Sequence, residues 1–315
     1  MPRLSIVIAA PQGHDERLEQ TLVSVLQHRP VSSELLVALP APYGDPYDLA
    51  AEGVRFVLTP PRTSAASCFN LAVGASDGDV IHTLASGVRV DEDWTQPAVA
   101  HFDDPNVATV APLVVDAAEP QRIASAGIGY SWGGRPRRIR AGRLHRPGKP
   151  LQVKPLGPTL SAGFVARWAW DAVGGLDARL PATLAAIDMA LLLAAAGGAC
   201  RFEPSSCAAT DAPSPKAGIG YGHAAERIFW RHRSTVGRRR SLLAHPVAVM
   251  WETLALLPQL AAFTTLLGRT AALPGIMAGL DRSIRAQRAI DGDGNDVLAL
   301  PRGEDESPRD YARAA

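Results

Sequence analysis

Residues 4–27 read LSIVIAAPQGHDERLEQTLVSVLQ and set the fold class. Leu4–Ala9 is an apolar run typical of a buried strand. The apolar side chains that follow have the spacing of an amphipathic helix, at Leu18, Leu22, Val25 and Leu26. Further strand-like runs follow at 35–39, 54–58 and 80–84, with a helical pattern at 64–73. Apolar strands that alternate with helices predict a parallel sheet covered on both faces.

The rest of the chain carries weaker signals of the same kind. We expect a helix over 94–102, strands over 107–111 and 160–166, a helix over 185–196 that ends at Gly197 and Gly198, and a last short strand over 201–203. In such sheets, ligands bind beyond the carboxyl ends of the strands. The loops after Ala9, Leu39, Leu58 and Leu84 are therefore where a functional site is expected.

Composition excludes some classes of function. The chain has 315 residues, of which 47% are apolar, and its net charge is +1. Such a balance argues against a nucleic-acid partner bound over the whole surface. Three scattered cysteines are too few for a disulfide framework and indicate reduced thiols in a cytoplasmic protein. A nicotinamide-dependent oxidoreductase is a distant alternative, because neither Gly127-Ile128-Gly129 nor Gly218-Ile219-Gly220 continues as a dinucleotide loop.

Four ordered segments resemble one family. They are the opening segment, PRTSAASCFNLAVGASDGDVIHTL at 61–84, VDEDWTQPAVAHFDDPNVATVAP at 90–112, and SAGFVARWAWDAVGGLDARL at 161–180. The last segment, with its Gly174-Gly175-Leu176-Asp177 turn, is the most specific. Together they are similar to the family 2 glycosyltransferases, which have the GT-A fold. The likeness covers residues 4–203, about two-thirds of the chain.

This resemblance implies an α/β architecture, with a GT-A-like, mostly parallel sheet flanked by helices and a C-terminal helical appendage. It implies transfer of a sugar from a nucleotide-sugar to an acceptor hydroxyl, on a bacterial surface polysaccharide or a glycolipid. It also implies a divalent manganese or magnesium ion held against the donor diphosphate by an Asp-x-Asp motif.

The polar motifs of the family are missing here. The base-contacting acidic positions fall on Leu39 and Pro40, and the Asp-x-Asp motif falls on 85–87, which read Ala-Ser-Gly. The Glu-Asp pair that contains the general base falls on 185–186, which read Ala-Ala. No metal ligand is therefore predicted. A catalytically inactive relative, which binds a sugar, a nucleotide or a partner glycosyltransferase, stays open as the alternative function.

The resemblance carries few residues into the site. Pro11 and Asn70 would line the nucleotide pocket, Arg62 would reach the phosphates, and Ser86 is the remaining polar side chain of the metal motif. Asp188 would supply acid–base chemistry if it faces the cleft, and nothing specific if it faces solvent. Asp91-Glu92-Asp93 is interpreted as a helix N-terminus rather than a displaced metal site. His82 is interpreted as a hydrogen-bonded core residue.

Charge and composition change along the chain. We expect a transferase-like domain over 1–205, a basic and apolar helical appendage over 206–285, and a disordered tail over 286–315. Arginines at 227, 231, 233, 238, 239 and 240, with Trp230 and Trp251 beside them, suggest that 225–280 attaches peripherally to an anionic membrane at its inner face. The alternative is a helical lid packed on the sheet. A second basic cluster, Arg135 to Lys149, would grip a diphosphate or a polyanionic acceptor, or else form a solvated loop.

Overall fold

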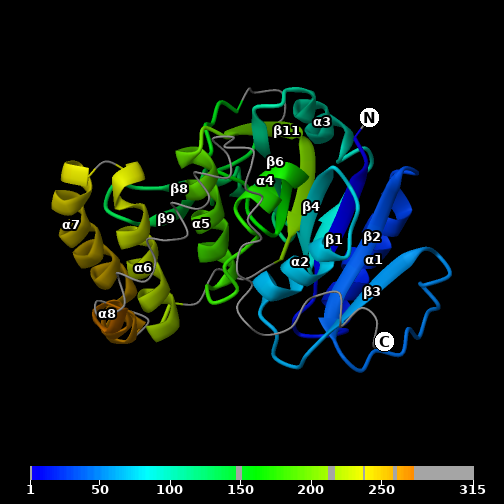
Figure 1. Ribbon diagram of the computed structural model, residues 1–315, viewed down its shortest axis with the longest axis horizontal. Coiled ribbons are helices and arrows are strands. Elements are labelled where there is room, and N and C mark those ends of the chain that lie inside the picture. Colours follow the sequence, from blue (N-terminus) through cyan, green and yellow to red (C-terminus); the bar gives the residue numbers. More distant parts are fainter. Residues whose placement is uncertain (1, 147–150, 212–216, 237, 258–260, 273–315) are drawn as a thin grey trace, which may run out of the picture.

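The computed structural model describes residues 2–146, 151–211, 217–236, 238–257 and 261–272. Within these ranges the chain forms one central sheet flanked by helices, and three further helices lie to one side of it (Figure 1). The predicted tail over 286–315 lies outside the described residues.

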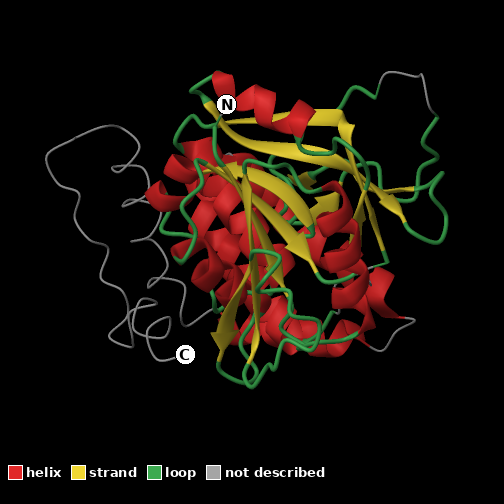
Figure 2. Cartoon of the chain, turned by 90° about the vertical axis from the view of Figure 1, so that its right-hand side faces the viewer, coloured by secondary structure: helices red, strands yellow, loops and turns green. Residues whose placement is uncertain are grey.

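The central sheet has the strand order β3-β2-β1-β4-β10-β6-β11-β5, with β7 paired to β6. Figure 2 shows its strands fanned across the molecule. Their bounds are β1 Leu4–Ala9, β2 Ser33–Pro40, β3 Val54–Thr59, β4 Val80–Ala85, β5 Val88–Val90, β6 Val107–Asp116, β7 Ile123–Ser125, β10 Ala162–Ala166 and β11 Ala199–Thr210. A separate hairpin joins β8, Ile128–Tyr130, to β9, Pro136–Arg138.

Most strands of the central sheet run in the same direction, so their carboxyl ends lie at one edge of the sheet. β1 runs parallel to β2 and β4, and β2 runs parallel to β3. β10 is antiparallel to both β4 and β6, so β6 runs in the same direction as β4. β11 is parallel to β6 and therefore ends at that same edge. The carboxyl ends of six strands, β1, β2, β3, β4, β6 and β11, thus face one side of the molecule.

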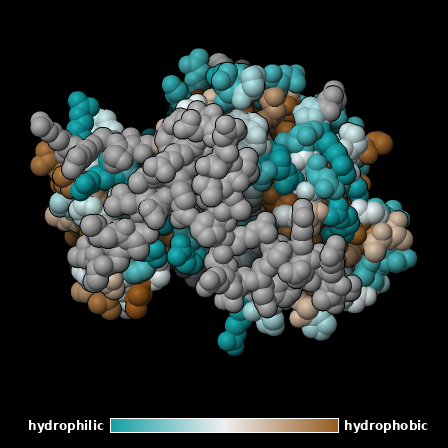
Figure 3. Space-filling model, viewed as in Figure 1, coloured by the Kyte–Doolittle hydropathy of each residue, from teal (hydrophilic) through white to brown (hydrophobic). Residues whose placement is uncertain are grey.

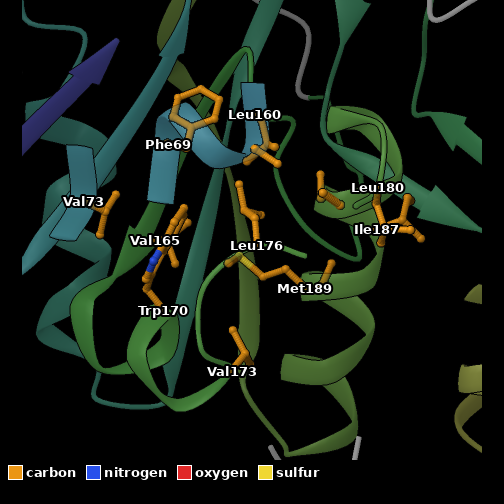
Figure 4. Close-up of a cluster of buried hydrophobic side chains, with 14 of the residues drawn as sticks. Phe69, Val73, Leu160, Val165, Trp170, Val173, Leu176, Leu180, Ile187 and Met189 are labelled. Atoms are coloured by element: carbon orange, nitrogen blue, oxygen red, sulfur yellow. The ribbon is translucent and has the colours of Figure 1, made fainter. Parts of the chain in front are cut away.

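Helices cover both faces of the sheet, as the apolar strands predict. The helices have the bounds α1 Glu16–His28, α2 Ala65–Gly74, α3 Gln96–Ala100, α4 Arg167–Ala172, α5 Ala182–Ala195, α6 Ile219–Val236, α7 Arg238–Leu256 and α8 Ala261–Ala272, with a 3-10 turn at His101–Asp103. Ile6 and Ile8 of β1 pack toward α1, whereas Val7 and Ala9 pack toward α2, α4 and α5. Figure 4 shows part of the cluster on the α2, α4 and α5 side, which includes Phe69, Trp170 and Met189.

A glycine before β4 and a capping aspartate before α1 determine the local backbone geometry at these two places. A Cβ atom at Gly78 would lie 2.7 Å from the Ser5 amide nitrogen and 2.9 Å from the Arg3 carbonyl oxygen. Only glycine therefore lets the turn before β4 pack against β1. Asp15 accepts a hydrogen bond from the Leu18 amide at 2.9 Å and so caps the N-terminus of α1.

Two predictions need correction at element boundaries. The strand expected over 201–203 is twelve residues long, because it pairs along the whole of β6 and tolerates register shifts at two bulges. The sheet therefore runs past residue 205, where the first unit was expected to end. The helix expected from Trp94 begins at Gln96, and Trp94 is buried instead.

His82 is a core residue, as predicted. Its ring stacks on Phe164 at 3.9 Å, and its Nε2 accepts a hydrogen bond from the Trp94 indole at 2.9 Å. That bond leaves Nδ1 as the donor to the Gly163 carbonyl, at 3.0 Å. The neighbouring acidic run Asp91–Asp93 is exposed and precedes α3.

The three C-terminal helices pack on one another rather than on the sheet. α6 contacts α5 and α8, and α7 contacts α6 and α8 (Figure 1). Arg231, predicted to face a membrane, is buried, and the half-buried Trp230 donates a hydrogen bond to Glu226. None of the helices in the described part of the chain is long and apolar enough to cross a membrane.

Candidate functional site

The candidate site lies at the carboxyl edge, which we define as residues 10–17, 41–53, 60–64, 86–87 and 211. These segments directly follow β1, β2, β3, β4 and β11. In open α/β sheets, ligands bind at such an edge, beyond the carboxyl ends of the strands. The edge is polar, in contrast with the strands that lead into it.

A guanidinium group lies over the end of β4. Arg17 Nη2 donates a hydrogen bond to Asp211 Oδ1 at 2.8 Å. A Cβ atom at Gly87 would lie 2.7 Å from Arg17 Nη2 and 2.8 Å from its Nε, and it would also strike Asp211. The Gly87 amide in turn donates to Thr21 Oγ1 at 2.9 Å, so α1 and the end of β4 are held together. Arg17 therefore occupies the space that a side chain at residue 87 would need.

The family's divalent metal does not fit this arrangement. Hard cations need oxygen ligands, and Ala85 and Gly87 carry no side-chain oxygen. Ser86 Oγ is directed to Asp15 Oδ1 at 3.3 Å, and that same oxygen caps α1. Across the described residues, no group of three or more His, Cys, Asp or Glu side chains is placed to hold a metal ion. A fixed positive charge, Arg17, stands beside the position instead.

Aromatic side chains line the neighbouring part of the edge. The rings of His14 and Tyr43 lie 5.6 Å apart, those of His14 and Tyr47 lie 6.1 Å apart, and Tyr43 packs on Phe56 at 4.7 Å. Tyr47 is 60% exposed. The loops after β1 and β2 thus present flat apolar surfaces of the kind on which a nucleobase stacks.

The structure places three of the predicted nucleotide-binding residues at the carboxyl edge. Pro11 follows β1, Arg62 follows β3 with a positive φ of 64°, and Ser86 follows β4. Arg62 is exposed. These three share the edge with Arg17 and the aromatic rings.

Asn70 lies elsewhere and has a different set of partners. Its side-chain amide donates to the Leu176 carbonyl at 2.8 Å and accepts from the Leu176 amide at 2.9 Å. Asn70 of α2 thereby holds the glycine turn in place. A side chain at Gly175, whose φ is +70°, would strike the Asn70 side chain. As placed, Asn70 joins two segments of the fold.

Asp188 faces neither an open cleft nor solvent. It is fully buried on α5, where Arg231 Nη1 donates to both carboxylate oxygens at 2.9 Å and His232 Nε2 lies 2.7 Å from Oδ1. Arg231 also reaches Asp177 of the glycine turn at 3.3 Å. The Asp188 carboxylate therefore joins α5 to α6.

A cavity of about 220 Å³ lies between the β8–β9 hairpin and the helices α5, α6 and α7. Arg135, Arg137 and Arg138 line it from the β8–β9 hairpin, and Thr183 and Tyr221 line it from α5 and α6. Burial raises the pKa of Tyr221 to about 12, so its hydroxyl stays protonated. Part of the predicted basic cluster thus lines a cavity, while Lys149 lies outside the described residues.

Sequence reasoning missed Arg17 and Asp211. They are 194 positions apart and meet because the end of β11 pairs with β5, which follows β4 in the chain and packs against α1. The one available signal is the polar run His14 to Arg17 directly after the first strand, at the edge where ligands bind. No pattern in the sequence connects that run to Asp211.

The comparisons with known proteins agree with this architecture. No protein-family model and no curated protein matches the sequence. A solved structure of GalNAc-T7 with UDP, GalNAc and Mn²⁺ matches 73% of this chain at 16% identity and a TM-score of 0.57; the match spans 48%, about half, of that chain. A mannosyltransferase from Pyrobaculum calidifontis, in complex with GDP-Man and Mn²⁺, matches 92% of this chain and 86% of its own at 16% identity and a TM-score of 0.50. The chain therefore has the GT-A glycosyltransferase fold.

Proposed function

We propose that the chain is a glycosyltransferase-like protein, related to family 2, that binds a nucleotide-sugar at its carboxyl edge without a divalent cation. The observation that carries this proposal is the Arg17 guanidinium over the end of β4. Both structural neighbours hold a nucleotide together with Mn²⁺. In this proposal the positive charge of Arg17, near the end of β4, takes the place of the metal ion in neutralising the diphosphate.

Electrostatics supports a diphosphate beside Arg17. Guanidinium groups match phosphate oxygens in geometry and charge. The buried Nε of Arg17 has no hydrogen-bond partner among the described residues, and Nη2 is held by a single carboxylate. In this proposal Arg62 and Ser86 contact the phosphates, while Pro11 and the His14–Tyr43–Tyr47 rings border the base.

The acceptor is proposed to enter from the arginine-lined cavity. Arg135 and Arg137 favour an acceptor with negative charge near its reactive hydroxyl, such as a phosphate-bearing glycolipid or an acidic polysaccharide. Asp188 stays the predicted acid–base residue, with the condition that its bonds to Arg231 and His232 must open first.

A second function, binding without transfer, is favoured by a specific observation. Positions 185 and 186 are alanines, and the nearby Asp188 is engaged by Arg231 and His232. A general base must reach the proton it accepts. A relative of this kind would bind a nucleotide-sugar or a partner glycosyltransferase and leave the chemistry to that partner.

Calorimetric titration of UDP and GDP, in EDTA and in MnCl₂, tests the binding site. We expect the same affinity in both buffers, and at least a tenfold loss in Arg17→Met. The matched control is Arg3→Met, because Arg3 also neighbours an aspartate, Asp77 at 3.9 Å, but at the opposite end of β1. Asp211→Asn should strengthen binding several-fold, since it removes the carboxylate that competes with the diphosphate for Arg17. Equal affinities in all four proteins would refute the site.

Turnover separates transfer from binding alone. Release of UDP or GDP from a panel of nucleotide-sugars is measured with and without lipid-phosphate and polysaccharide acceptors. Product formation that Arg17→Met reduces and Arg3→Met does not supports a transferase. Tight binding with no release from any donor supports the non-catalytic relative.

A further inference from the structure

Helices α6, α7 and α8 form a compact unit with unusually close helix contacts. A side chain at Gly222 of α6 would strike the Thr265 backbone of α8, and one at Gly268 of α8 would strike the Ile219 carbonyl of α6. These two glycines therefore let the backbones of α6 and α8 touch. The unit is a defined body and not a set of loosely attached helices.

Charged side chains of this unit lie inside it. Arg269 of α8 pairs with Glu226 of α6 at 2.8 Å and with Glu252 of α7 at 2.5 Å. His245 lies 3.0 Å from Glu226 and also reaches the Gly133 carbonyl at 2.8 Å. Glu226, Glu252 and Arg269 are all buried. The network joins the three helices to each other and to the β8–β9 hairpin.

Large apolar side chains lie on the outside. Leu243 is 80% exposed, Phe263 71% and Trp251 61%. The spacing along α7 defines one helical stripe, and with its neighbours on α8 it forms what we call the α7–α8 face: Leu243, Val247, Met250, Trp251, Leu254, Phe263, Leu266 and Leu267. Figure 3 shows brown, apolar atoms gathered over α7 and α8 at the lower left. A groove of about 520 Å³ runs through this face between Met250, Leu254 and Leu266.

The charge around the α7–α8 face has one sign. Glu252 is the sole acidic residue in the described parts of α7 and α8, and it is held in the interior. The exposed Arg240 near the start of α7 lies over the ring of Trp132, itself 56% exposed, at 5.3 Å. Arg238 and Arg239 precede it in the same helix. The α7–α8 face itself carries no charged side chain, and an arginine and a tryptophan lie at one end of it.

We infer that the α7–α8 face docks on an anionic lipid bilayer, with α7 and α8 lying in the plane of the interface. Helices with apolar residues on one side and polar groups on the other settle at the headgroup boundary. Arginines near the surface add attraction to anionic lipids. A protein interface of ordinary size carries hydrogen bonds across it, whereas the charged side chains that line the groove, Glu226, His245 and Arg269, are bonded to one another. The inference does not depend on the proposed nucleotide site.

Vesicle flotation of the full chain tests the inference. Vesicles of phosphatidylcholine alone are compared with vesicles that also contain phosphatidylglycerol, at low salt and at 0.5 M NaCl. We expect co-flotation with the anionic vesicles at low salt and weaker binding to the neutral ones. The triple variant Val247→Ser, Trp251→Ser, Phe263→Ser should bind the anionic vesicles at least tenfold more weakly.

The matched control is Val23→Ser with Val31→Ser, two exposed apolar residues near α1. It should float like the unmodified chain, and circular dichroism should show that both variants are folded. Absence of flotation with anionic vesicles at low salt would overturn the inference, as would unchanged flotation of the triple variant. Light scattering that finds a dimer lost in the triple variant, with no vesicle binding, would assign the face to a second copy of the chain and also overturn it.

Discussion

At the scale of single residues, we expect His82 of β4 to make the stability of the folded chain depend on pH. Burial lowers the pKa of His82 to about 4 from an ordinary value of 6.5, against the opposing hydrogen bond to Gly163. Below pH 6.5 the His82 imidazole binds a proton in the unfolded chain, whereas in the folded chain it stays neutral down to about pH 4. The free energy of unfolding therefore falls as the pH drops from 6.5 toward 4.

We expect this residue to remove about 2 kcal/mol of stability between pH 7 and pH 5. Urea unfolding of the unmodified chain and of His82→Gln at both pH values measures it. The variant is less stable at pH 7 but should lose much less on acidification. A slope that persists in His82→Gln would show that another group causes it.

Asp188 is the residue for which structural and catalytic roles must be separated. Asp188→Asn removes the charge that faces Arg231 and His232 in the interior. We expect a loss of about 3 kcal/mol in denaturant unfolding, because Arg231 keeps only Asp177 as counter-charge.

The control for Asp188→Asn is Asp91→Asn, an exposed aspartate, which should be neutral. The transfer activity of Asp188→Asn, divided by the amount of folded protein, is then compared with that of the unmodified chain. Unchanged stability of Asp188→Asn would mean that the carboxylate is not needed to hold α6, and it would strengthen a catalytic role.

At the scale of elements, the α6–α8 unit depends on its interior charges. Burial tends to raise the pKa of Glu226, but the hydrogen bonds and charges of His245 and Arg269 outweigh it and lower the pKa. Arg269→Met leaves Glu226 and Glu252 buried without that cation, and we expect a loss of about 3–5 kcal/mol.

Chemical unfolding measures this loss, with Arg89→Met as the neutral control, because Arg89 is the exposed residue between the buried valines of β5. Adding Glu252→Gln to Arg269→Met should recover part of the stability, because it removes one of the unpaired charges. If Arg269→Met is as stable as the control, the interior network does not hold the three helices together.

At the scale of the whole molecule, the fold and the missing metal ligands determine how the protein responds to cations. We expect the rise in melting temperature with UDP to be the same in EDTA, MgCl₂ and MnCl₂. The double change Ala85→Asp, Gly87→Asp restores the family motif, but residue 87 has φ +89° and its side chain would strike Arg17.

The double variant should therefore melt several degrees lower and gain no response to manganese. Adding both Arg17→Ala and Asp211→Ala removes the two side chains that a residue at position 87 would strike, and it should create that response. A manganese-dependent rise in the unmodified chain would contradict the metal-free site and direct attention to Asp91 and Asp93.

The sequence by itself determined the strands of the sheet, the helices that cover it and the loops at the carboxyl ends of the strands. Strands such as Leu4–Ala9 and Ser33–Pro40 are buried on both faces, so their apolar runs are visible without tertiary knowledge. The glycine turn at 174–175 is equally legible, because positive φ restricts the residue type.

Only the tertiary structure decided which polar groups meet. Arg17 and Asp211 come together because the end of β11 pairs with β5, which packs against α1, and Asp188 contacts Arg231 because α6 packs on α5. The α7 sequence shows an apolar helix with one glutamate, but which side faces inward depended on Arg269 of a different helix. Local periodicity records how often a residue type recurs, whereas the pairing of charges depends on contacts between segments distant in the chain.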